Sequence, residues 1–294
     1  MKTIIIIAAF TFLFANIAKS QGCIAVRNIS GFGQYNLTDN AFTTSSWQIN
    51  INNRYFKAFR DFKGTQDQKT PALNENVTES YSMDITLSRF FNNGWSADFD
   101  LPVLANSRET SGEHGGPNTP RHNTHAFGIG DVRLTVYKWL LQPSVSQKFN
   151  LQIGMGIKLP TGDYKYQDYF YRNDTTKVLA PVNPAIQLGD GGTGIITELN
   201  AFYFFNKKFS MYGNFYYLIN PREQNGVSTT FGRVPPAVQI KAGNTEASVT
   251  DVFSLRGGFI FNTNNIAISA GLRDEGVPVH DLVGGSNGTR RGWP

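Results

Sequence analysis

The chain repeatedly alternates apolar and polar side chains over segments of about ten residues. Residues 149–159, for example, read Phe-Asn-Leu-Gln-Ile-Gly-Met-Gly-Ile-Lys-Leu. Successive side chains of a β-strand point to opposite faces, so such a segment has one apolar face and one polar or glycine face. Strands of soluble sheets are usually about five or six residues long, whereas strands that cross a bilayer need about nine to eleven. The pattern predicts an all-β fold: an antiparallel up-and-down transmembrane β-barrel with lipid outside and water inside.

The first residues have the features of a secretory signal peptide. Lys2 supplies a positive charge, residues 4–17 are mostly apolar, and Ala18-Lys19-Ser20 offers a small-x-small cleavage site. The apolar run is shorter than the about twenty residues that a membrane-spanning helix needs. The expected organisation is a signal peptide at 1–20, an N-terminal periplasmic segment at 21–45 and an outer-membrane barrel at 46–294.

Cys23 is the only cysteine, so the chain cannot form an internal disulfide. Its position close to the cleavage site leaves two interpretations open. Cys23 could carry the acyl chains of a lipoprotein, although Ser20-Gln21-Gly22 has no aliphatic residue where a lipobox usually has leucine. Otherwise it is a small residue near a processed terminus.

The composition agrees with a barrel. Beyond the leader no long apolar run occurs, and the mean hydropathy is −0.29. Such a value is expected because a barrel strand exposes only alternate residues to lipid. Aromatic residues make up 13% of the chain, enough for girdles at the two membrane interfaces. The net charge of +5 falls to +3 when Lys2 and Lys19 leave with the leader, which gives no reason to expect a nucleic-acid partner.

Nine segments carry the alternation and are expected to be wall strands. Their apolar side chains, Val132 and Phe253 among them, are predicted to face lipid, and the intervening polar ones to face the lumen. The segments are residues 47–55, 81–88, 95–103, 131–136, 149–159, 195–203, 209–217, 253–261 and 266–273.

The connections between these strands are alternately short and long. The short ones, rich in Asn, Gly and Lys as hairpin turns are, are residues 91–94, 141–147, 206–208 and 262–265. The long ones are residues 60–77, 105–126, 160–191, 220–250 and 275 onward. Outer-membrane barrels have short periplasmic turns and long extracellular loops, and this is the arrangement that the pattern predicts.

Nine is an odd number, whereas bacterial barrels have an even number of strands and must close. The chain stops at Arg290-Arg291-Gly292-Trp293-Pro294, inside what would be a loop. We therefore expect a C-terminally truncated sequence that lacks about three strands of a barrel of about twelve. The alternative is that residues 23–30 supply an additional strand.

Two motifs resemble the signatures of a known family. Residues 128–134, Gly-Ile-Gly-Asp-Val-Arg-Leu, and residues 159–163, Leu-Pro-Thr-Gly-Asp, are similar to the Gly-x-Gly-Asp and Leu-Pro-Thr-Gly signatures of outer-membrane proteins grouped under a meta-pathway of phenol degradation. The motif resemblance spans roughly residues 125–220, and the whole chain resembles longer transporter-like proteins of Bacteroidetes. It implies a β-barrel with a transport role in a Gram-negative outer membrane. The family heading reflects genomic context, so phenol is not implied as the substrate.

The same motifs have an architectural interpretation. Gly128 and Gly130 would let a neighbouring strand or loop approach the wall, and Asp131 would point into the lumen. Pro160 would end its strand because it cannot donate a hydrogen bond, and Gly162 could turn with positive φ.

Charged side chains recur on the inward face of the predicted strands. Opposed charges could select polar solutes in an open pore, or could form salt bridges that hold a narrow barrel shut. We prefer the pore and leave the closed lumen open as an alternative. The predicted lumen-lining residues are Asp84, Asp98, Asp100, Asp131, Arg133, Lys158, Glu198, Arg256 and Arg273, with Arg54 as a further inward charge.

The loop at 164–171 is the densest aromatic stretch. Its candidate solute-binding residues, Tyr164, Tyr166, Tyr169 and Tyr171, could capture sugars or phenolic rings through their faces and hydroxyl groups. The loop could also fold into the lumen as a constriction, or its tyrosines could rest at the membrane interface.

No metal site is expected. His114, His122 and His125 share one long loop and three imidazoles could bind zinc or copper, but their spacing is irregular. We prefer a solvated, mobile loop.

No catalytic role is expected, because no Gly-x-Ser-x-Gly nucleophile motif occurs. His125 with Asp131 or Asp163 could imitate the acid and histidine of a barrel protease at the extracellular rim. Residues 189–192, Gly-Asp-Gly-Gly, are predicted to be a turn and not a phosphate cradle, because no helix follows them.

Together these features predict a single-domain outer-membrane channel for the diffusion of small solutes, aromatic or hydrophobic ones among them, without a cofactor. The expected partners are outer-membrane lipids, the transported small molecule and the barrel-assembly machinery. A structural or surface-binding barrel with a closed lumen is the alternative, and an outer-membrane enzyme is a less favoured one. The sequence does not determine the oligomeric state.

Overall fold

The computed structural model describes residues 46–59, 61–63, 66–68, 74–141, 148–263, 266–277 and 282–287. The predicted signal peptide, the segment at 21–45 and Cys23 lie outside these residues.

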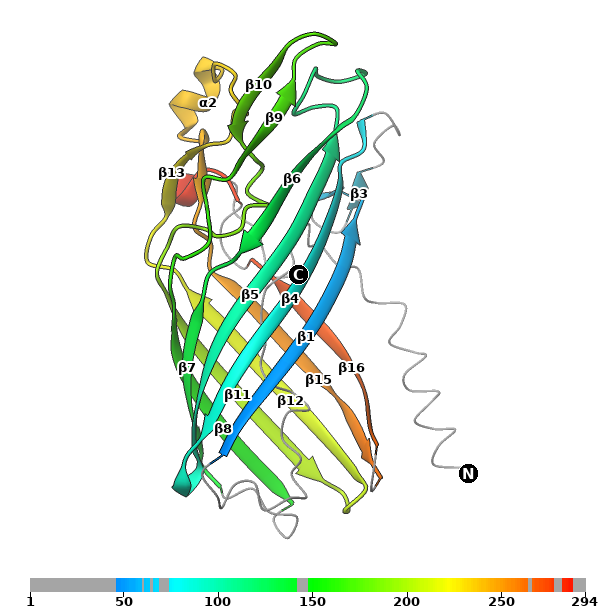
Figure 1. Ribbon diagram of the computed structural model, residues 1–294, viewed down its shortest axis with the longest axis vertical. Coiled ribbons are helices and arrows are strands. Elements are labelled where there is room, and N and C mark those ends of the chain that lie inside the picture. Colours follow the sequence, from blue (N-terminus) through cyan, green and yellow to red (C-terminus); the bar gives the residue numbers. More distant parts are fainter. Residues whose placement is uncertain are drawn as a thin grey trace.

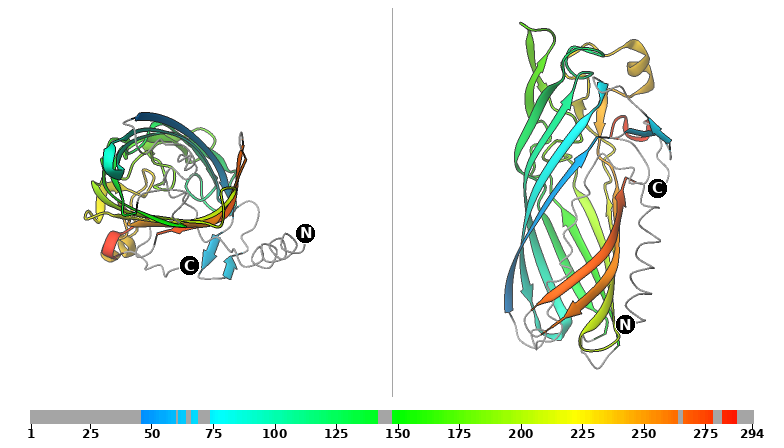
Figure 2. Two further views of the ribbon diagram at one scale, coloured as in Figure 1. Left: turned by 90° about the horizontal axis from the view of Figure 1, so that it is seen from below. Right: turned by 90° about the vertical axis from the view of Figure 1, so that its right-hand side faces the viewer.

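In the described residues the fold is one antiparallel sheet in which nine strands follow one another in sequence order and a tenth, β6 (His122–Ile129), joins β5; the sheet curls around a lumen (Figure 1, Figure 2). Short turns join the strands at one end and long excursions at the other. All nine predicted strands are present, and the predicted all-β, barrel-like fold is confirmed. The strands are β1 (Ser46–Ala58), β4 (Val77–Phe90), β5 (Trp95–Thr110), β7 (Arg133–Trp139), β8 (Phe149–Lys158), β11 (Gly194–Phe204), β12 (Phe209–Ile219), β15 (Val252–Asn262) and β16 (Ala267–Gly276).

The register aligns apolar side chains into rows across the outer face. One row runs through Phe99, Leu134, Ile157, Ile195 and Ile219, each directly opposite the next on the neighbouring strand. All five side chains are exposed. Side chains of alternate residues share a face, so a matched register produces one continuous apolar outer surface.

The interior is polar. Among the described residues, buried polar and charged side chains outnumber buried apolar ones, and the large exposed side chains are mostly Ile, Leu, Phe and Trp of the wall strands. This distribution is the reverse of that in a soluble domain, where apolar side chains fill the core.

Two apolar side chains of the predicted outward rows are buried. Val132 and Phe253, predicted to face lipid, are 9% and 3% exposed. Val132 precedes β7 at an irregularity of the wall described below, which removes it from the outward row. Phe253 is the second residue of β15, and its ring lies close to Gly276, its partner on β16.

The short turns are as predicted where they are described. Asn93 takes the left-handed conformation in the β4–β5 turn, which contains the 3-10 helix η3 (Asn92–Gly94). The side chain of Asn206 accepts hydrogen bonds from the backbone N–H groups of Lys208 and Phe209 at 2.8 and 2.9 Å.

The long excursions hold more structure than predicted. They gather beyond one end of the wall, where β9, β10, β13 and α2 are labelled in Figure 1. β6 extends the sheet along β5, and in the described residues three two-stranded sheets pair β2 with β3, β9 with β10 and β13 with β14. The additional elements are β2 (Asp61–Lys63), β3 (Gln66–Gln68), β6 (His122–Ile129), β9 (Gln167–Tyr171), β10 (Lys177–Pro181), β13 (Gln224–Ser228), α2 (Ala237–Ala242), β14 (Glu246–Ser248) and η4 (Gly285–Asn287).

Among the described residues, no helix is long and apolar enough to cross a membrane.

The two edge strands of the curled sheet meet through inward side chains. Arg54 of β1 forms an ion pair with Glu275 of β16, with a second contact of 3.4 Å from Nη1 to Oε2. Glu275 also pairs with Arg273. β1 is the first strand of the wall and β16 is the ninth. Because neighbouring strands are antiparallel, these two edge strands run in the same direction.

Candidate lumen site

The site is organised by a β-bulge in the strand that contains the first family-like motif. β6 and β7 both pair with β5: Val103 lies opposite Ile129, and Asp100 lies opposite Arg133. Three residues therefore separate the pairs on one strand and two on the other, which defines a bulge at residues 130–132. One additional residue reverses which side chains face inward.

The reversal is visible in the burial pattern. In β7 the odd-numbered residues are buried, whereas in β6 the even-numbered ones, such as Thr124 and Ala126, are buried. His125, Phe127 and Ile129 consequently point outward.

Thr161 of the second motif satisfies the backbone of the bulge. Its hydroxyl donates to the carbonyl oxygen of Gly130 at 2.9 Å and accepts from the backbone N–H of Val132 at 2.9 Å. The N–H of Leu159 donates to the carbonyl oxygen of Val132 at 2.8 Å. The two motifs, which are separated in sequence, are therefore joined by hydrogen bonds into one structural unit.

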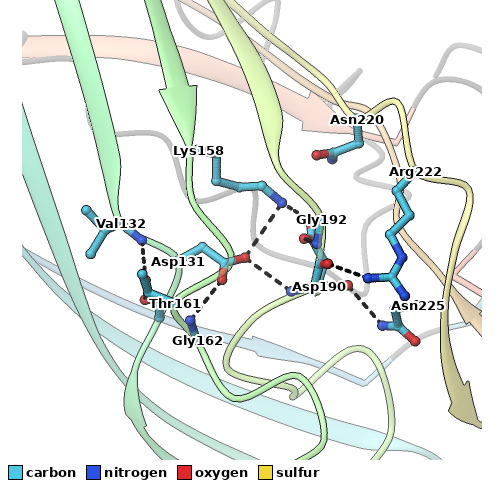
Figure 3. Close-up of polar contacts among 12 residues, drawn as sticks. Asp131, Val132, Lys158, Thr161, Gly162, Asp190, Gly192, Asn220, Arg222 and Asn225 are labelled. Atoms are coloured by element: carbon cyan, nitrogen blue, oxygen red, sulfur yellow. Dashed lines mark hydrogen bonds and ion pairs between the residues drawn. The ribbon is translucent and has the colours of Figure 1, made fainter.

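Asp131 is the centre of a charged network (Figure 3). Its carboxylate accepts the N–H groups of Gly162 at 3.0 Å and Asp190 at 3.1 Å. Lys158 Nζ lies 3.6 Å from Asp131 Oδ2 and forms an ion pair with Asp190. Asp131 and Lys158 are both almost fully buried, so the network joins the wall to residue 190 in a site sheltered from solvent.

Residues 182–190, which we call the inner segment, follow β10 and fold against the inner face of the wall. Ile186 and Leu188 pack with Leu104 and Ala126 in a buried apolar cluster. The side-chain amide of Asn106 donates to the carbonyl oxygen of Ile186 at 3.1 Å. The lumen is therefore narrowed at this level by a segment of the chain itself.

Glycines permit this close approach, as predicted for Gly128 and Gly130. A Cβ at Gly130 would lie 2.8 Å from Leu104 Cδ1, and one at Gly128 2.9 Å from Leu188 Cδ1. The prediction for Gly162 was wrong in its reason: its φ is not positive. Glycine is needed there because a Cβ would lie 2.6 Å from the carbonyl oxygen of Leu188.

A cavity of about 120 Å³ lies beside the network. Asp131, Arg133 and Lys158 from the wall and Gln187 and Asp190 from the inner segment contribute to its lining. In the sheet register Arg133 lies directly opposite Asp100 on one side and Lys158 on the other.

The remaining predicted lumen residues also point inward. Glu198 accepts hydrogen bonds from the Tyr137 hydroxyl at 2.9 Å and from the Asn214 amide at 2.8 Å. Asp100 accepts from the Thr86 hydroxyl at 2.5 Å. Asp84 and Asp98 are buried on the same face, and Arg256 and Arg273 lie directly opposite each other on β15 and β16. The predicted charges therefore share one lumen, although most are spread along it and do not form one cluster.

The aromatic loop does not enter the lumen as one unit. β9 and β10 form a hairpin that rises beyond the wall (Figure 1). Tyr169 is exposed beneath Lys177, and Tyr171 stacks on His122 with ring centroids 4.4 Å apart. Tyr166 packs on the apolar cluster, and Tyr164 lies against Gly191. The constriction comes from the following inner segment.

The expected solvated histidine loop was wrong for His114. This side chain is fully buried, and its Nδ1 accepts the backbone N–H of Tyr171 at 3.0 Å. Burial lowers the pKa of His114 to about 4, helped by the charges of His122 and Arg172. His114 is therefore held neutral and acts as a hydrogen-bond acceptor. It belongs to a packed group of loops that we call the cap: residues 111–121, the β9–β10 hairpin at 167–181, and residues 229–233.

His125 lies apart from His114 and His122. Its backbone N–H donates to Asp168 Oδ2 at 2.7 Å and its ring Nδ1 lies 3.6 Å from the same atom; these contacts join it to neither Asp131 nor Asp163. In the part of the chain that the structure describes, no group of three His, Cys, Asp or Glu side chains is placed to hold a metal ion.

Two arginines that sequence reasoning missed tie the cap together. Arg172 donates to the carbonyl oxygens of Glu113 at 3.0 Å and His114 at 3.2 Å, and also to that of Phe231. Arg233 donates to the backbone carbonyl oxygen of Gly112 at 3.1 Å and to that of His114. The acceptors are backbone carbonyls remote in sequence, so no side-chain pattern marks these residues.

The fold and the site define a class: an antiparallel barrel wall with an apolar outer face, a charged lumen and an inner segment fixed to the wall by a bulge. Residues 60–176 match the family described as "Putative MetA-pathway of phenol degradation". The match covers both motifs and confirms the family resemblance. No curated protein matches the chain.

Proposed function

We propose that this chain forms the wall of an outer-membrane channel through which small solutes diffuse. The observation that carries the proposal is the inverted distribution of side chains: a continuous apolar outer face around a lumen lined by charged and polar groups. Soluble proteins rarely expose apolar patches larger than a few hundred Å², whereas this arrangement is that of outer-membrane barrels.

The rim at the short turns supports a membrane location. Trp47 and Trp95 are exposed there, with Arg89 4.9 Å from the ring centroid of Trp47 and Lys138 5.0 Å from that of Trp95. Phe209 stacks on Phe259 at 5.6 Å in the same region. Aromatic residues with neighbouring cations are typical of the membrane interface.

The lumen offers polar groups that need water or a solute. Among the described residues, the buried Tyr216 hydroxyl and the hydroxyls of Ser210 and Ser254 have no hydrogen-bond partner. Buried polar groups are usually satisfied by protein or water, which supports a hydrated path. The phenol pathway in the family description supports aromatic compounds among the solutes.

Liposome swelling tests this function. Vesicles that contain the folded chain should swell in isotonic solutions of small sugars and of small aromatic solutes, and should swell more slowly as solute size rises. Vesicles with heat-denatured chain are the control. Equal rates in the two preparations would overturn the proposal.

The inner segment favours a second candidate, a surface-binding barrel with a closed lumen. Its apolar cluster and its charged network fix it against the wall, and the cap above it is packed. A chain that folds, stays impermeable to every solute and keeps its loops protected from protease would favour this candidate.

A further inference from the structure

Arg133, a charged residue of the cavity, takes no part in the hydrogen bonds and ion pairs of the Asp131 network. Arg133 lines the cavity and is 5% exposed. Its Nε has no hydrogen-bond partner among the described residues, and no ion pair there includes it. A buried nitrogen donor without an acceptor is costly, and a ligand that brings acceptor oxygens to Arg133 Nε would satisfy it.

The neighbouring charges already have partners. Asp131 and Asp190 share Lys158 and backbone N–H groups, and Asp100 holds the Thr86 hydroxyl. The carboxylates of Asp100, Asp84 and Asp131 act on Arg133 electrostatically, and none of them forms an ion pair with it among the described residues. A cationic solute would therefore have to displace existing contacts, whereas an anion would meet the Nε donor of Arg133, which has no acceptor among the described residues.

The rest of the lining suits an amphipathic ligand. Phe56, Leu218 and Val252 provide apolar surface, while Gln187 and Asn225 provide amides. The volume of about 120 Å³ is of the same order as the roughly 150 Å³ of an engineered cavity that holds a benzene ring.

We propose that Arg133 is the anchor of a binding subsite for small aromatic or aliphatic monocarboxylates in this cavity. The planar guanidinium can bind a carboxylate through two parallel hydrogen bonds, and the apolar wall receives the hydrocarbon part. The inference rests on the proposed function, because it gives the diffusing solute a chemical class.

Isothermal titration of the folded, detergent-solubilised chain tests the subsite, with benzoate and benzyl alcohol as probes at neutral pH. The two ligands have similar size and differ in charge. We expect a Kd for benzoate about tenfold lower than for benzyl alcohol. Arg133→Gln should remove this preference. Arg121→Gln, the same chemical change at a cap residue that pairs with Glu75 and Glu109, should keep it.

Equal affinity of the unmodified chain for the two probes, no binding of either, or a preference that survives in Arg133→Gln would overturn the subsite. If Arg133→Gln fails to fold, Arg133→Lys keeps a charge without the planar fork and should lower the preference. Swelling without benzoate preference would refute the subsite and leave the channel, whereas benzoate preference in an impermeable chain would refute the channel and leave the subsite.

Discussion

The hydroxyl of Thr161 bridges both sides of the bulge, accepting the N–H of Val132 at 2.9 Å while donating to the carbonyl oxygen of Gly130. The bulge leaves these backbone groups outside the ladder of β5. One side chain from the loop that follows β8 therefore compensates for an irregularity in another strand.

Thr161→Val preserves the shape of this side chain and removes both hydrogen bonds. We expect a loss of about 1 kcal/mol in the free energy of unfolding, the usual net value of such bonds. Urea titration of the barrel in micelles measures it. Thr193→Val, at an exposed threonine, is the matched control; equal losses in the two variants would contradict the bridging role of Thr161.

Gly162→Ala places a Cβ 2.6 Å from the carbonyl oxygen of Leu188 and 2.8 Å from its carbonyl carbon. Because these atoms are backbone, the inner segment must move, at a cost of about 1–3 kcal/mol. Limited proteolysis should then cut within residues 182–190. Gly213→Ala, whose Cβ would meet no atom within 4 Å, should not sensitise this segment; identical digestion patterns would argue against the close approach.

Lys158→Met leaves Asp131 and Asp190 without their shared cation. Breaking a buried ion pair from one side costs about 3–5 kcal/mol, so we expect a loss of this size in urea titration. Adding Asp190→Asn to Lys158→Met should recover part of the loss, because one unpaired carboxylate disappears. If the losses of Lys158→Met and of Asp190→Asn alone add strictly in the double variant, Lys158 and Asp190 are not coupled.

The cap should loosen in acid. The pKa of His114 is about 4 in the folded chain, below its ordinary value of 6.5, because of burial and the nearby charges of His122, Arg172 and Arg233, partly opposed by Asp168. Between these two pH values the unfolded loop binds a proton that the folded loop does not. Stability of the cap is therefore complete above about pH 6.5 and falls progressively towards pH 4.

Hydrogen exchange at the Tyr171 amide, corrected for its intrinsic pH dependence, follows this change. His114→Asn keeps an acceptor for that amide without a titrating group, and should show protection independent of pH over the same window. Persistence of the pH dependence in this variant would assign it to another group.

The wall strands were predictable because alternation is a local property: each strand records which of its side chains face outward. The bulge was not, since its effect appears only in the pairing of residues 122–139 with β5, and Val132 was misplaced for this reason. The burial of His114 was equally hidden. It depends on Arg172, Arg233 and a hairpin that arrive from other loops.

The two motifs could be recognised in the sequence, but only part of what their residues do in the structure could be predicted from it. Asp131 was correctly predicted to point inward. Its partners Lys158 and Asp190 come from β8 and from the inner segment, and only the fold brings them together. Whether Arg133 Nε is left without a hydrogen-bond acceptor also depends on how the neighbouring charges are paired, and the sequence does not show this pairing.

The channel itself is tested most directly by single-channel conductance of the folded chain in a planar bilayer. We predict steady openings, with a reversal potential that shifts towards cation preference in Arg133→Glu because an inward positive charge becomes negative. Silence from a chain that is shown to be folded by its heat-modifiable migration would contradict the channel and favour the closed, surface-binding barrel.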